Sequence, residues 1–395
     1  MKDVLKIAGF IFLLIIVTQV KAQNLSDKVI PGAERVIMYK PVIKNKVIAV
    51  VANHTSMVGN RHLVDTLVSL GANIKKIFCP EHGFRGNEDA GKLIKNGRDA
   101  KTGIPIVSLY GKKVKPTAAD LAGIDVVIYD LQDVGVRFYT YISTLTYMMD
   151  ACAESFKLLM VLDRPNPNGF YVDGPVLDLK YKSFVGVLPI PVVYGMTPGE
   201  LAGMINKEGW LSKGAECSLG VIKCENYTHK TLYRLPVNPS PNLQNMKAVY
   251  LYPSLALFEG TAINVGRGTD FPFQVFGHPR LTEASFQYKP RSIAGVSVSP
   301  PHLGETCNGV DLRGLSEEEL VAAPGLNLEY LISAYQKFPD KATFFNSFFE
   351  NLAGTGQLRK QIISGANAAE IKASWQSELQ KFKEARKKYL LYADF

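Results

Sequence analysis

The sequence predicts an α/β fold in which helices cover both faces of a parallel sheet. Five apolar runs of strand length follow one another in the first half of the chain, each rich in Val, Ile or Leu. Helix-sized intervals separate these runs, which span 47–51, 74–78, 104–109, 126–129 and 158–162. Continuous apolar strands of this kind are typical of parallel sheets that are buried on both faces.

Two helices of this region have local signals. One fits residues 62–70, between the first two strands. The other begins at Thr197, which can cap the helix N-terminus. Pro198 fits its first position, and Glu200 completes a capping box. We expect this helix to end near Asn206.

The character of the sequence changes near residue 250. A strand is expected at 218–225, followed by a loop at 235–242 that contains three prolines. From residue 250 onward Tyr, Phe, Gly and Pro dominate, which indicates a second domain. In that domain we expect a strand at 295–298 and amphipathic helices at 326–338 and 369–389.

The first 22 residues have the pattern of a secretory signal peptide. Lys2 and Lys6 form a basic start, residues 7–17 are almost wholly apolar, and Val20-Lys21-Ala22 offers small residues for cleavage. The apolar run is short for a membrane span, although an uncleaved anchor is the alternative. We therefore expect an exported protein, periplasmic or secreted, with no stable membrane insertion after cleavage.

Composition and charge argue against several function classes. The 395 residues include 45 Lys and Arg against 36 Asp and Glu, without a run of five basic residues, so no nucleic-acid partner is expected. No H-E-x-x-H or C-x-x-C motif occurs and the six histidines are scattered, so no metal site is expected. The first strand leads to Asn53 and not to a G-x-G-x-x-G motif, so we expect neither a dinucleotide nor another cofactor.

The five cysteines, at positions 79, 152, 217, 224 and 307, form no metal-binding pattern. Cys217 and Cys224 are close enough in sequence to bridge a hairpin, and the sequence leaves this disulfide open. A chain of this length can build a core without such a bond.

Polar side chains stand at the carboxyl ends of the five predicted strands: Asn53, Glu81, Tyr110, Asp130 and Asp163. In a parallel sheet these ends share one edge. Open α/β sheets of the Rossmann-like kind bind ligands in the crevice outside that edge. We therefore expect these residues to converge on one site.

The turn from Cys79 to Gly86 holds the first cluster, because it contains Glu81, His82 and Arg85. A carboxyl group in a cleft is suited to general acid catalysis, which makes Glu81 the candidate acid. His82 either orients this acid or acts alone, and Arg85 is a candidate substrate contact. The structural alternative is a capped turn with a surface acid.

A second cluster runs from Asp130 to Tyr141. Asp130 and Asp133 flank a strand end, and the planar fork of Arg137 suits a carboxylate. Tyr139 and Tyr141 suit contact with a sugar. The alternative is a helix N-terminus with favourable acids.

Two further clusters combine charged groups with turn residues. Asp163, Arg164 and Asn166 lie in a segment rich in Pro and Asn, where a purely structural ion pair is the alternative. Glu259 lies in an aromatic and glycine-rich stretch, and Arg267 stands between two glycines. Such glycines either shape the backbone to present one side chain or mark a β-bulge.

The clusters belong to longer stretches: Asn53-His54-Thr55-Ser56, Pro80–Gly86, Asp130–Tyr141, Asp163–Gly169, Pro239–Asn242, Leu257–Thr261, Val265–Thr269, Leu352–Thr355 and Lys388–Tyr392. In this order and spacing they resemble the exo-β-N-acetylmuramidases of glycoside hydrolase family 171, the NamZ type, formerly catalogued as a domain of unknown function. The resemblance covers nearly the whole chain after residue 22.

The resemblance implies a Rossmann-like catalytic domain, a smaller C-terminal α+β auxiliary domain and a site in the cleft between them. We place the signal peptide at 1–22, the catalytic domain at 23–250 and the auxiliary domain at 251–395. It also implies a glycosidase that releases N-acetylmuramic acid from the non-reducing ends of peptidoglycan fragments, so the expected partners are muramyl saccharides. By motif, the catalytic glutamate is Glu81.

We assign catalysis to Glu81, His82 and Asp130. The candidate substrate contacts are Asn53, His54, Arg85, Asp133, Arg137, Tyr139, Asp163, Arg164, Asn166, Glu259 and Arg267.

Two roles stay open between several groups. The group that stabilises the oxocarbenium-like centre is Asp130, Asp133, Glu259 or the acetamido group of the substrate. The cation for the lactyl carboxylate is Arg137, Arg164 or Arg267. Two competing functions are a non-catalytic periplasmic muropeptide-binding protein and a metal-dependent hydrolase of phosphate or amide bonds.

Overall fold

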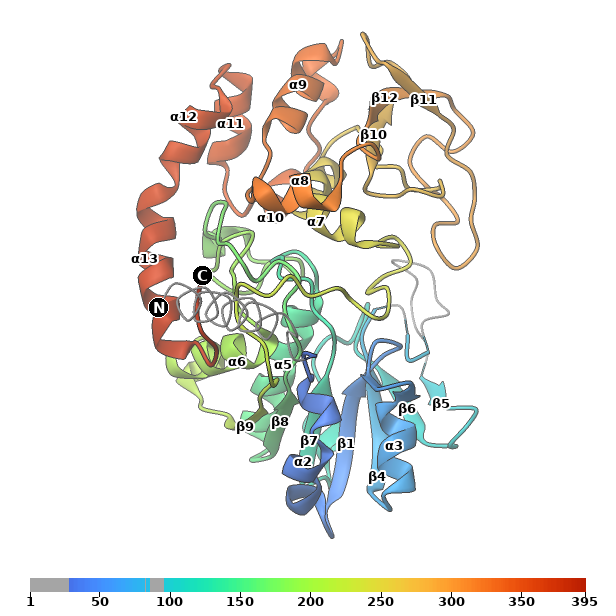
Figure 1. The fold of residues 1–395 in the computed structure, drawn as a ribbon, viewed down its shortest axis with the longest axis vertical. Helices are drawn as coiled ribbons and strands as arrows, with labels where there is room; N and C mark the ends of the chain where they lie inside the picture. Colours follow the sequence, from blue (N-terminus) through green and yellow to red (C-terminus); the bar gives the residue numbers. More distant parts are fainter. Residues whose placement is uncertain (1–27, 82, 86–95) are drawn as a thin grey trace, which may run out of the picture.

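The computed structural model describes residues 28–81, 83–85 and 96–395. Its largest element is a seven-stranded sheet with the order β5-β6-β4-β1-β7-β8-β9 (Figure 1). The strands are β1 Val47–Ala52, β4 Asn73–Cys79, β5 Gly97–Arg98, β6 Pro105–Ser108, β7 Val126–Asp130, β8 Leu158–Leu162 and β9 Ser218–Ile222. All neighbours are parallel except β5 and β6, which pair antiparallel. The predicted parallel sheet is confirmed.

The strand order is Rossmann-like and locates the edge where ligands bind. Along the chain, β4 and β6 are added on one side of β1, and β7, β8 and β9 on the other. The direction of winding therefore reverses between β1 and β7, which is the point where open α/β sheets hold ligands. The register pairs Ala52 with Asp130, so both strands end at this edge.

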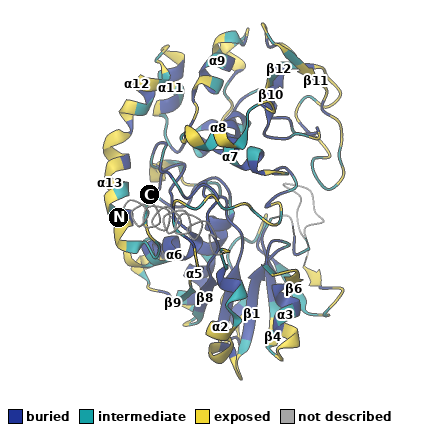
Figure 2. Cartoon of the chain, viewed as in Figure 1, coloured by how far each residue is buried: buried dark blue, intermediate teal, exposed yellow. Residues whose placement is uncertain are grey.

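Helices cover both faces of the sheet, as predicted. On one face, Val51, Val127 and Val161 belong to a core shared with helices α5 and α6. On the other face, Ile48 and Ile128 belong to a core shared with α2 and α3. Successive strand residues point to opposite faces, so two cores bury the whole of each central strand. Figure 2 shows the central strands as interior elements. The helices are α2 Val36–Ile43, α3 Leu63–Ser69, α4 Ala118–Leu121, α5 Tyr141–Glu154 and α6 Pro198–Lys207.

Helix α6 begins as the sequence predicts. The Thr197 hydroxyl accepts a hydrogen bond from Glu200 N at 3.3 Å, and Glu200 Oε2 accepts one from Thr197 N at 2.9 Å. The predicted capping box is confirmed. The short hairpin of β2 and β3 follows β1, and single 3-10 turns complete this part of the chain: β2 Met57–Val58, β3 Arg61–His62, η1 Gly32–Glu34, η2 Leu179–Tyr181 and η3 Ser212–Gly214.

The C-terminal part is a separate α+β layer that lies beyond the carboxyl edge of the large sheet (Figure 1). It contains a three-stranded antiparallel sheet of order β10-β12-β11. Its elements are α7 Met246–Leu255, η4 Ala256–Gly260, β10 Val275–His278, β11 Phe286–Tyr288, β12 Cys307–Asp311, α8 Glu317–Ala322, α9 Glu329–Lys337, η5 Lys341–Thr343, α10 Phe349–Ala353, α11 Gln357–Ile363, α12 Ala368–Ser374, α13 Gln376–Arg386 and η6 Lys387–Tyr389. The predicted boundary at residue 250 falls inside α7 and stays a prediction.

Two predicted elements of this part differ from the structure. No strand forms at 295–298, because Gly295 has a φ of 76° and the chain turns back to join Ile293 and Ser297 by an isolated bridge. The helix expected at 369–389 is divided at Trp375, whose φ of −105° and ψ of 0° interrupt the helix between α12 and α13. The buried ring of Trp375 anchors this break.

All five cysteines are free and buried, so the disulfide between Cys217 and Cys224 is not formed. The Cys224 thiol instead donates to the Asp163 carbonyl at 3.3 Å. Within the described ranges, no helix has the length and apolar character needed to cross a membrane.

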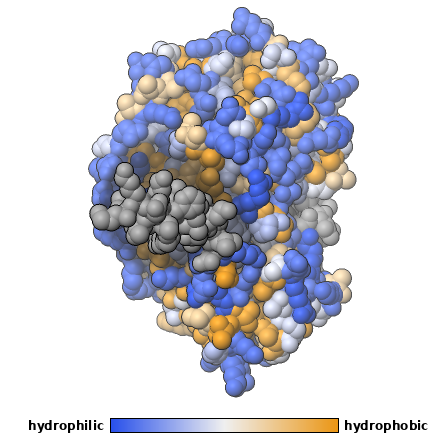
Figure 3. Space-filling view, viewed as in Figure 1, coloured by the Kyte–Doolittle hydropathy of each residue, from blue (hydrophilic) through white to orange (hydrophobic). Residues whose placement is uncertain are grey.

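The face seen in Figure 3 is hydrophilic over most of the C-terminal helices, and hydrophobic side chains gather at its lower end near α2. Ile37 and Met38 of α2 are exposed large hydrophobic residues.

Candidate active site

Glu81 lies at the carboxyl edge of the sheet, directly after β4, and faces the C-terminal part. It lines a small cavity of about 60 Å³. The lining comes from both parts of the chain: Glu81, Tyr139, Thr140, Tyr141, Ser240, Asn242, Leu243, Tyr252, Arg267 and Phe273. The structure therefore brings together Glu81, Tyr139 and Arg267, three of the predicted site residues.

Hydroxyl groups surround the Glu81 carboxylate. The Thr140 hydroxyl donates to Glu81 Oε2 at 3.4 Å. The Tyr110 phenol also forms a hydrogen bond with Glu81, and burial together with this carboxylate raises the Tyr110 pKa. Glu81 itself is half-buried. These neighbours orient the acid while leaving it at the wall of the cavity.

Arg267 brings a cation from the C-terminal part to the same cavity. Its Nε donates to Glu259 Oε1 at 2.6 Å, and its guanidinium lies 5.2 Å from the ring centre of Phe273. Burial alone would lower the Arg267 pKa, but Glu259 and then Glu81 outweigh burial and raise it. The flanking Gly266 and Gly268 have φ values of 76° and 79°, a conformation that favours glycine.

Tyr139 and His54 connect the sheet edge to the loop at 235–242, and Tyr141 binds Asn53 beside them. The Tyr139 hydroxyl donates to the Pro239 carbonyl at 2.6 Å, and Asn53 Nδ2 donates to the Tyr141 hydroxyl at 2.7 Å. His54 Nε2 lies 2.9 Å from the Asn238 carbonyl, and burial lowers the His54 pKa. Asn53 and His54 therefore support the wall of the cavity and do not themselves line it.

Asp130 and Arg164 form a buried ion pair and do not reach the Glu81 cavity. Arg164 Nε donates to Asp130 Oδ1 at 2.5 Å, and its Nη2 donates to Oδ2 at 2.9 Å. The Asp130 side chain is 0% exposed. The predicted catalytic role of Asp130 does not fit this position, because no sugar can approach a fully enclosed carboxylate.

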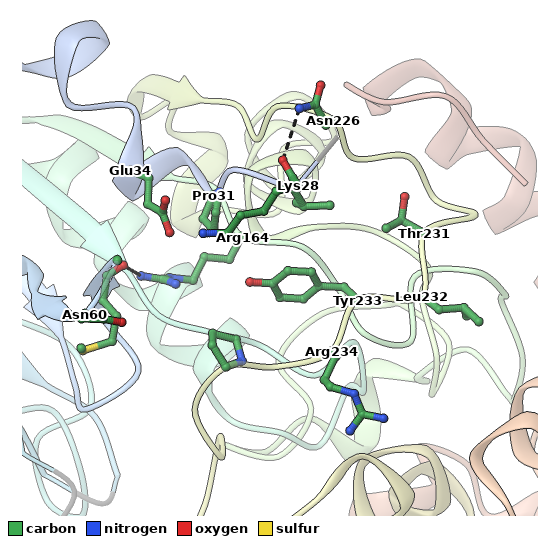
Figure 4. A pocket seen from close by; sticks show the side chains of 14 residues that line it. Lys28, Pro31, Glu34, Asn60, Arg164, Asn226, Thr231, Leu232, Tyr233 and Arg234 are labelled. Atoms are coloured by element: carbon green, nitrogen blue, oxygen red, sulfur yellow. Dashed lines mark hydrogen bonds between the residues drawn. The ribbon is translucent and has the colours of Figure 1, made fainter. Parts of the chain in front are cut away.

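Arg164 faces a different hollow, of about 470 Å³, in the sheet-bearing part. Figure 4 shows the Arg164 guanidinium on the Asn60 side of this hollow, where its Nη2 donates to the Met57 carbonyl at 3.0 Å, while the Tyr233 hydroxyl points toward the Arg164 side chain. Glu34 and Asn60 lie on its walls. Arg164 is not among the residues that line the Glu81 cavity, so its predicted convergence with Glu81 on one cavity is not seen, and its substrate contact stays a prediction.

Asp163 and Asn166 hold neighbouring backbone and do not face a cavity. Asp163 accepts hydrogen bonds from Gly199 N at 2.7 Å and from the Tyr392 hydroxyl at 2.6 Å. Asn166 Nδ2 donates to the Met196 carbonyl at 2.8 Å. Both predicted substrate contacts are corrected to structural positions, because their polar atoms are consumed inside the protein. Burial raises the Asp163 pKa to about 6.

Asp133 is also interior. Its Oδ2 accepts hydrogen bonds from Gly135 N at 2.6 Å and from the Tyr194 hydroxyl. Burial raises the Asp133 pKa to about 7, although these hydrogen bonds oppose the shift. The side chain is 1% exposed and does not line the Glu81 cavity, so its substrate contact stays a prediction that this position does not support.

Arg137 joins the two parts of the chain. Its guanidinium donates to four backbone carbonyls, those of Pro175, Ile190, Leu352 and Ala353, at 2.7 to 2.9 Å. The side chain is fully buried, and burial lowers its pKa to about 9. In the structure Arg137 therefore connects the two parts of the chain, and its buried guanidinium does not reach the predicted substrate carboxylate.

Arg85 is paired on the outer side of β4. It donates to Asp99 Oδ2 at 2.9 Å and to Asp65 Oδ1 at 3.3 Å. It is not among the residues that line the Glu81 cavity, and its substrate contact stays a prediction. His82 lies outside the described residues.

Comparison with known proteins agrees with this architecture. The family model described as exo-beta-N-acetylmuramidase NamZ, N-terminal, matches residues 48–247, and its C-terminal counterpart matches residues 250–392. The chain belongs to the NamZ family. The resemblance seen in the sequence is thereby confirmed, and with it the glycosidase class.

One curated relative is peptidoglycan beta-N-acetylmuramidase NamZ of Bacillus subtilis (strain 168). It is 37% identical over 94% of this chain and 92% of its own length. Two solved structures of DUF1343 family proteins from Bacteroides fragilis NCTC 9343 also match. The first is 53% identical with a TM-score of 0.87, over 93% of this chain and all of the other. The second is 28% identical with a TM-score of 0.80, over 92% and 99%.

Several residues of this NamZ-family cavity escaped the sequence-based assignment. Tyr252, Phe273, Ser240 and Asn242 all line it, yet none was predicted as a site residue. The signal for two of them was present, because Ser240 and Asn242 belong to the stretch 239–242 that carries part of the family resemblance. In the described part of this NamZ-family chain, no group of three or more His, Cys, Asp or Glu side chains is arranged to hold a metal ion.

Proposed function

We propose that this protein is an exo-β-N-acetylmuramidase that releases N-acetylmuramic acid from the non-reducing end of peptidoglycan fragments, with Glu81 as the general acid. The observation that carries the proposal is the position of Glu81. It is a half-buried carboxyl group in a cavity between the two parts of the chain, with the Arg267 cation on the opposing part. NamZ-family membership supplies the substrate class.

In this mechanism Glu81 protonates the glycosidic oxygen as the leaving group departs. Thr140 and Tyr110 hold the carboxyl group through their hydroxyls, which fixes the direction of proton transfer. The charge that develops on the sugar ring requires a second stabilising group on the other side of the scissile bond.

We assign that second role to the acetamido group of the substrate. Two observations support this assignment. Asp130 and Asp133 are enclosed in the protein, and the Glu259 carboxylate is bound to Arg267 at 2.6 Å. A 2-acetamido sugar carries its own nucleophile next to the anomeric carbon, so it does not depend on a second free carboxylate.

We assign the lactyl carboxylate of muramic acid to Arg267. The Nη groups of Arg137 donate to four backbone carbonyls in the interior, and Arg164 faces another hollow. Arg267 lines the Glu81 cavity with a side chain that is 22% exposed. Its guanidinium uses Nε for Glu259, and the Nη groups offer the fork geometry that carboxylates prefer.

We also propose that the protein is exported to the periplasm or beyond, on the basis of the signal pattern in residues 1–22. Mass spectrometry of the protein from its native host gives the test. An intact Met1 in the mature protein contradicts the proposal.

The decisive experiment is hydrolysis of a chromogenic β-N-acetylmuramide. We expect turnover by the wild type and a loss of about 10²- to 10⁴-fold in kcat for Glu81→Gln. The matched control is Glu225→Gln, which removes a surface carboxylate paired with Arg35 and should leave kcat unchanged. Undiminished turnover by Glu81→Gln contradicts the acid role.

The same experiment separates the competing functions. A non-catalytic muropeptide-binding protein shows saturable binding without turnover. A metal-dependent hydrolase loses its activity in a chelator, whereas the proposed mechanism is insensitive to it.

A further inference from the structure

Asn242 stands at the end of the loop 235–242 and lines the cavity together with Glu81 and Arg267. The loop is held in place by the Tyr139 hydroxyl, which donates to the Pro239 carbonyl at 2.6 Å. The Asn242 backbone N–H donates to Ser240 Oγ at 3.2 Å. These two hydrogen bonds fix the loop, and with it the position of the Asn242 side chain relative to Glu81.

The orientation of the Asn242 amide follows from its one side-chain partner. Nδ2 donates to the Val296 carbonyl at 3.1 Å. A carbonyl oxygen can only accept, so the nitrogen end of the amide must face Val296. The oxygen end, Oδ1, is the free end of the group.

Asn242 Oδ1 is buried and has no hydrogen-bond partner among the described residues. The residue is 1% exposed. Buried polar atoms are nearly always paired, and each exception calls for an explanation. Among the described side chains that carry such an unpaired atom, Asn242 is the one that lines the Glu81 cavity.

The cavity otherwise presents an acid, a cation, hydroxyls and aromatic rings. Glu81 is assigned to proton transfer and Arg267 to a carboxylate. A neutral, fixed acceptor suits a different ligand group, namely a hydroxyl or an amide N–H. A site that holds such an acceptor discriminates strongly against a ligand without the matching donor, because the acceptor then stays unpaired.

We propose that Asn242 Oδ1 accepts a hydrogen bond from a donor of the sugar bound at Glu81 and that Asn242 determines specificity for this sugar. The donor is either a ring hydroxyl or the acetamido N–H. This inference rests on the proposed function for the identity of the sugar. It assigns to Asn242 the recognition of an uncharged group, separate from the lactyl carboxylate.

The test compares wild type with Asn242→Leu on the chromogenic β-N-acetylmuramide and on analogues that lack the 4-hydroxyl or the 6-hydroxyl. For the analogue that lacks the 2-acetamido group, which the proposed mechanism cannot hydrolyse, calorimetry compares the Kd values of the two proteins instead. Leu has a similar volume but no acceptor. We expect a loss of about 10- to 100-fold in kcat/KM on the parent compound. On the one analogue that lacks the true donor, wild type and variant should be equal. Any effect of an analogue that is common to both enzymes cancels in the ratio of the wild-type kcat/KM to the variant kcat/KM.

Two further variants control for structure. Asn242→Asp keeps an acceptor at the position and should retain the wild-type order of the analogues even if it is less stable. Gln244→Leu removes an amide two residues away, whose Nε2 donates to the Pro241 carbonyl and which does not line the cavity. We expect wild-type kcat/KM for it. The inference is overturned if Asn242→Leu shows the same loss on every analogue or no loss at all.

Failure of the proposed function is distinguishable from failure of this inference. If the wild type does not hydrolyse the muramide, calorimetry with N-acetylmuramic acid and its deoxy analogues gives the same comparison as ratios of Kd. Binding that depends on Asn242 for one analogue only supports the inference without turnover. The inference is overturned if the ratio of the Asn242→Leu Kd to the wild-type Kd is the same for all analogues.

Discussion

Two groups of polar residues follow neighbouring strands of one sheet, yet they have different fates. After β4, Glu81 lies half-buried at a cavity shared with the C-terminal part. After β7 and β8, Asp130 and Arg164 bind each other in the interior. Residue type and position in the strand are alike in both groups. What separates them is the partner, because a charge that is already paired and enclosed is unavailable to a substrate.

The largest effect that tests this contrast is on stability. Arg164→Met leaves the Asp130 carboxylate buried without its cation, and we expect a loss of about 3–5 kcal/mol in the free energy of unfolding. Chemical denaturation measures it. The control, Arg35→Met, breaks an exposed pair with Glu225 and should cost about 0–1 kcal/mol. Equal losses in the two variants would show that the Asp130–Arg164 ion pair contributes no more to stability than an exposed pair does.

A second effect is the pH dependence of stability at Asp133. Burial raises its folded pKa to about 7, above the ordinary value of 3.8, so the folded protein retains a proton that the unfolded chain releases. Stability therefore falls as pH rises from 4 to 7, by on the order of 2 kcal/mol between pH 5 and pH 7. Asp133→Asn cannot ionise and should gain stability relative to wild type over that interval.

Denaturation of both proteins at pH 5 and pH 7 measures this difference. Asp133→Gln provides a control for the size of the site, because it is also uncharged but one methylene longer. The same difference between wild type and Asp133→Asn at both pH values is the result that contradicts the assignment.

The smallest effect concerns Arg267 at the cavity. Arg267→Lys keeps the charge but loses the fork that binds a carboxylate through two nitrogens. We expect KM for the muramide to rise about tenfold, equivalent to about 1.4 kcal/mol, with kcat little changed. Steady-state kinetics measures both constants. The control is Arg291→Lys, at a surface pair with Asp270, for which an equal rise in KM would argue against a specific role of Arg267.

The sequence was sufficient to predict the sheet, because continuous apolar runs such as Val126–Asp130 are buried by local pattern alone. It also singled out Glu81 and Arg267, whose neighbourhoods are rich in glycine. It did not predict the partner of Arg137, since the carbonyls of Leu352 and Ala353 lie more than 200 residues further along the chain. Hydrogen bonds to backbone carbonyls place no demand on residue type and leave no signal in the sequence.

The same limit explains the other corrections. The Asp163 carboxylate accepts hydrogen bonds from Gly199 N and the Tyr392 hydroxyl, which come from α6 and from the last residues of the chain. Asn242 and Tyr252 were missed for a different reason, because they lie outside the strand ends and charged clusters from which the candidate residues were taken. Their place at the cavity depends on the C-terminal part lying against the edge of the sheet. Local pattern does not specify that docking.

The four carbonyl acceptors of Arg137 have a consequence for how this chain can be divided. Two of them come from the segment between β8 and α6, and two come from the end of α10. If the two family segments were produced separately, the buried Arg137 guanidinium would lose two of its four carbonyl acceptors. We therefore expect that neither half, expressed alone, folds as stably as it does within the whole chain.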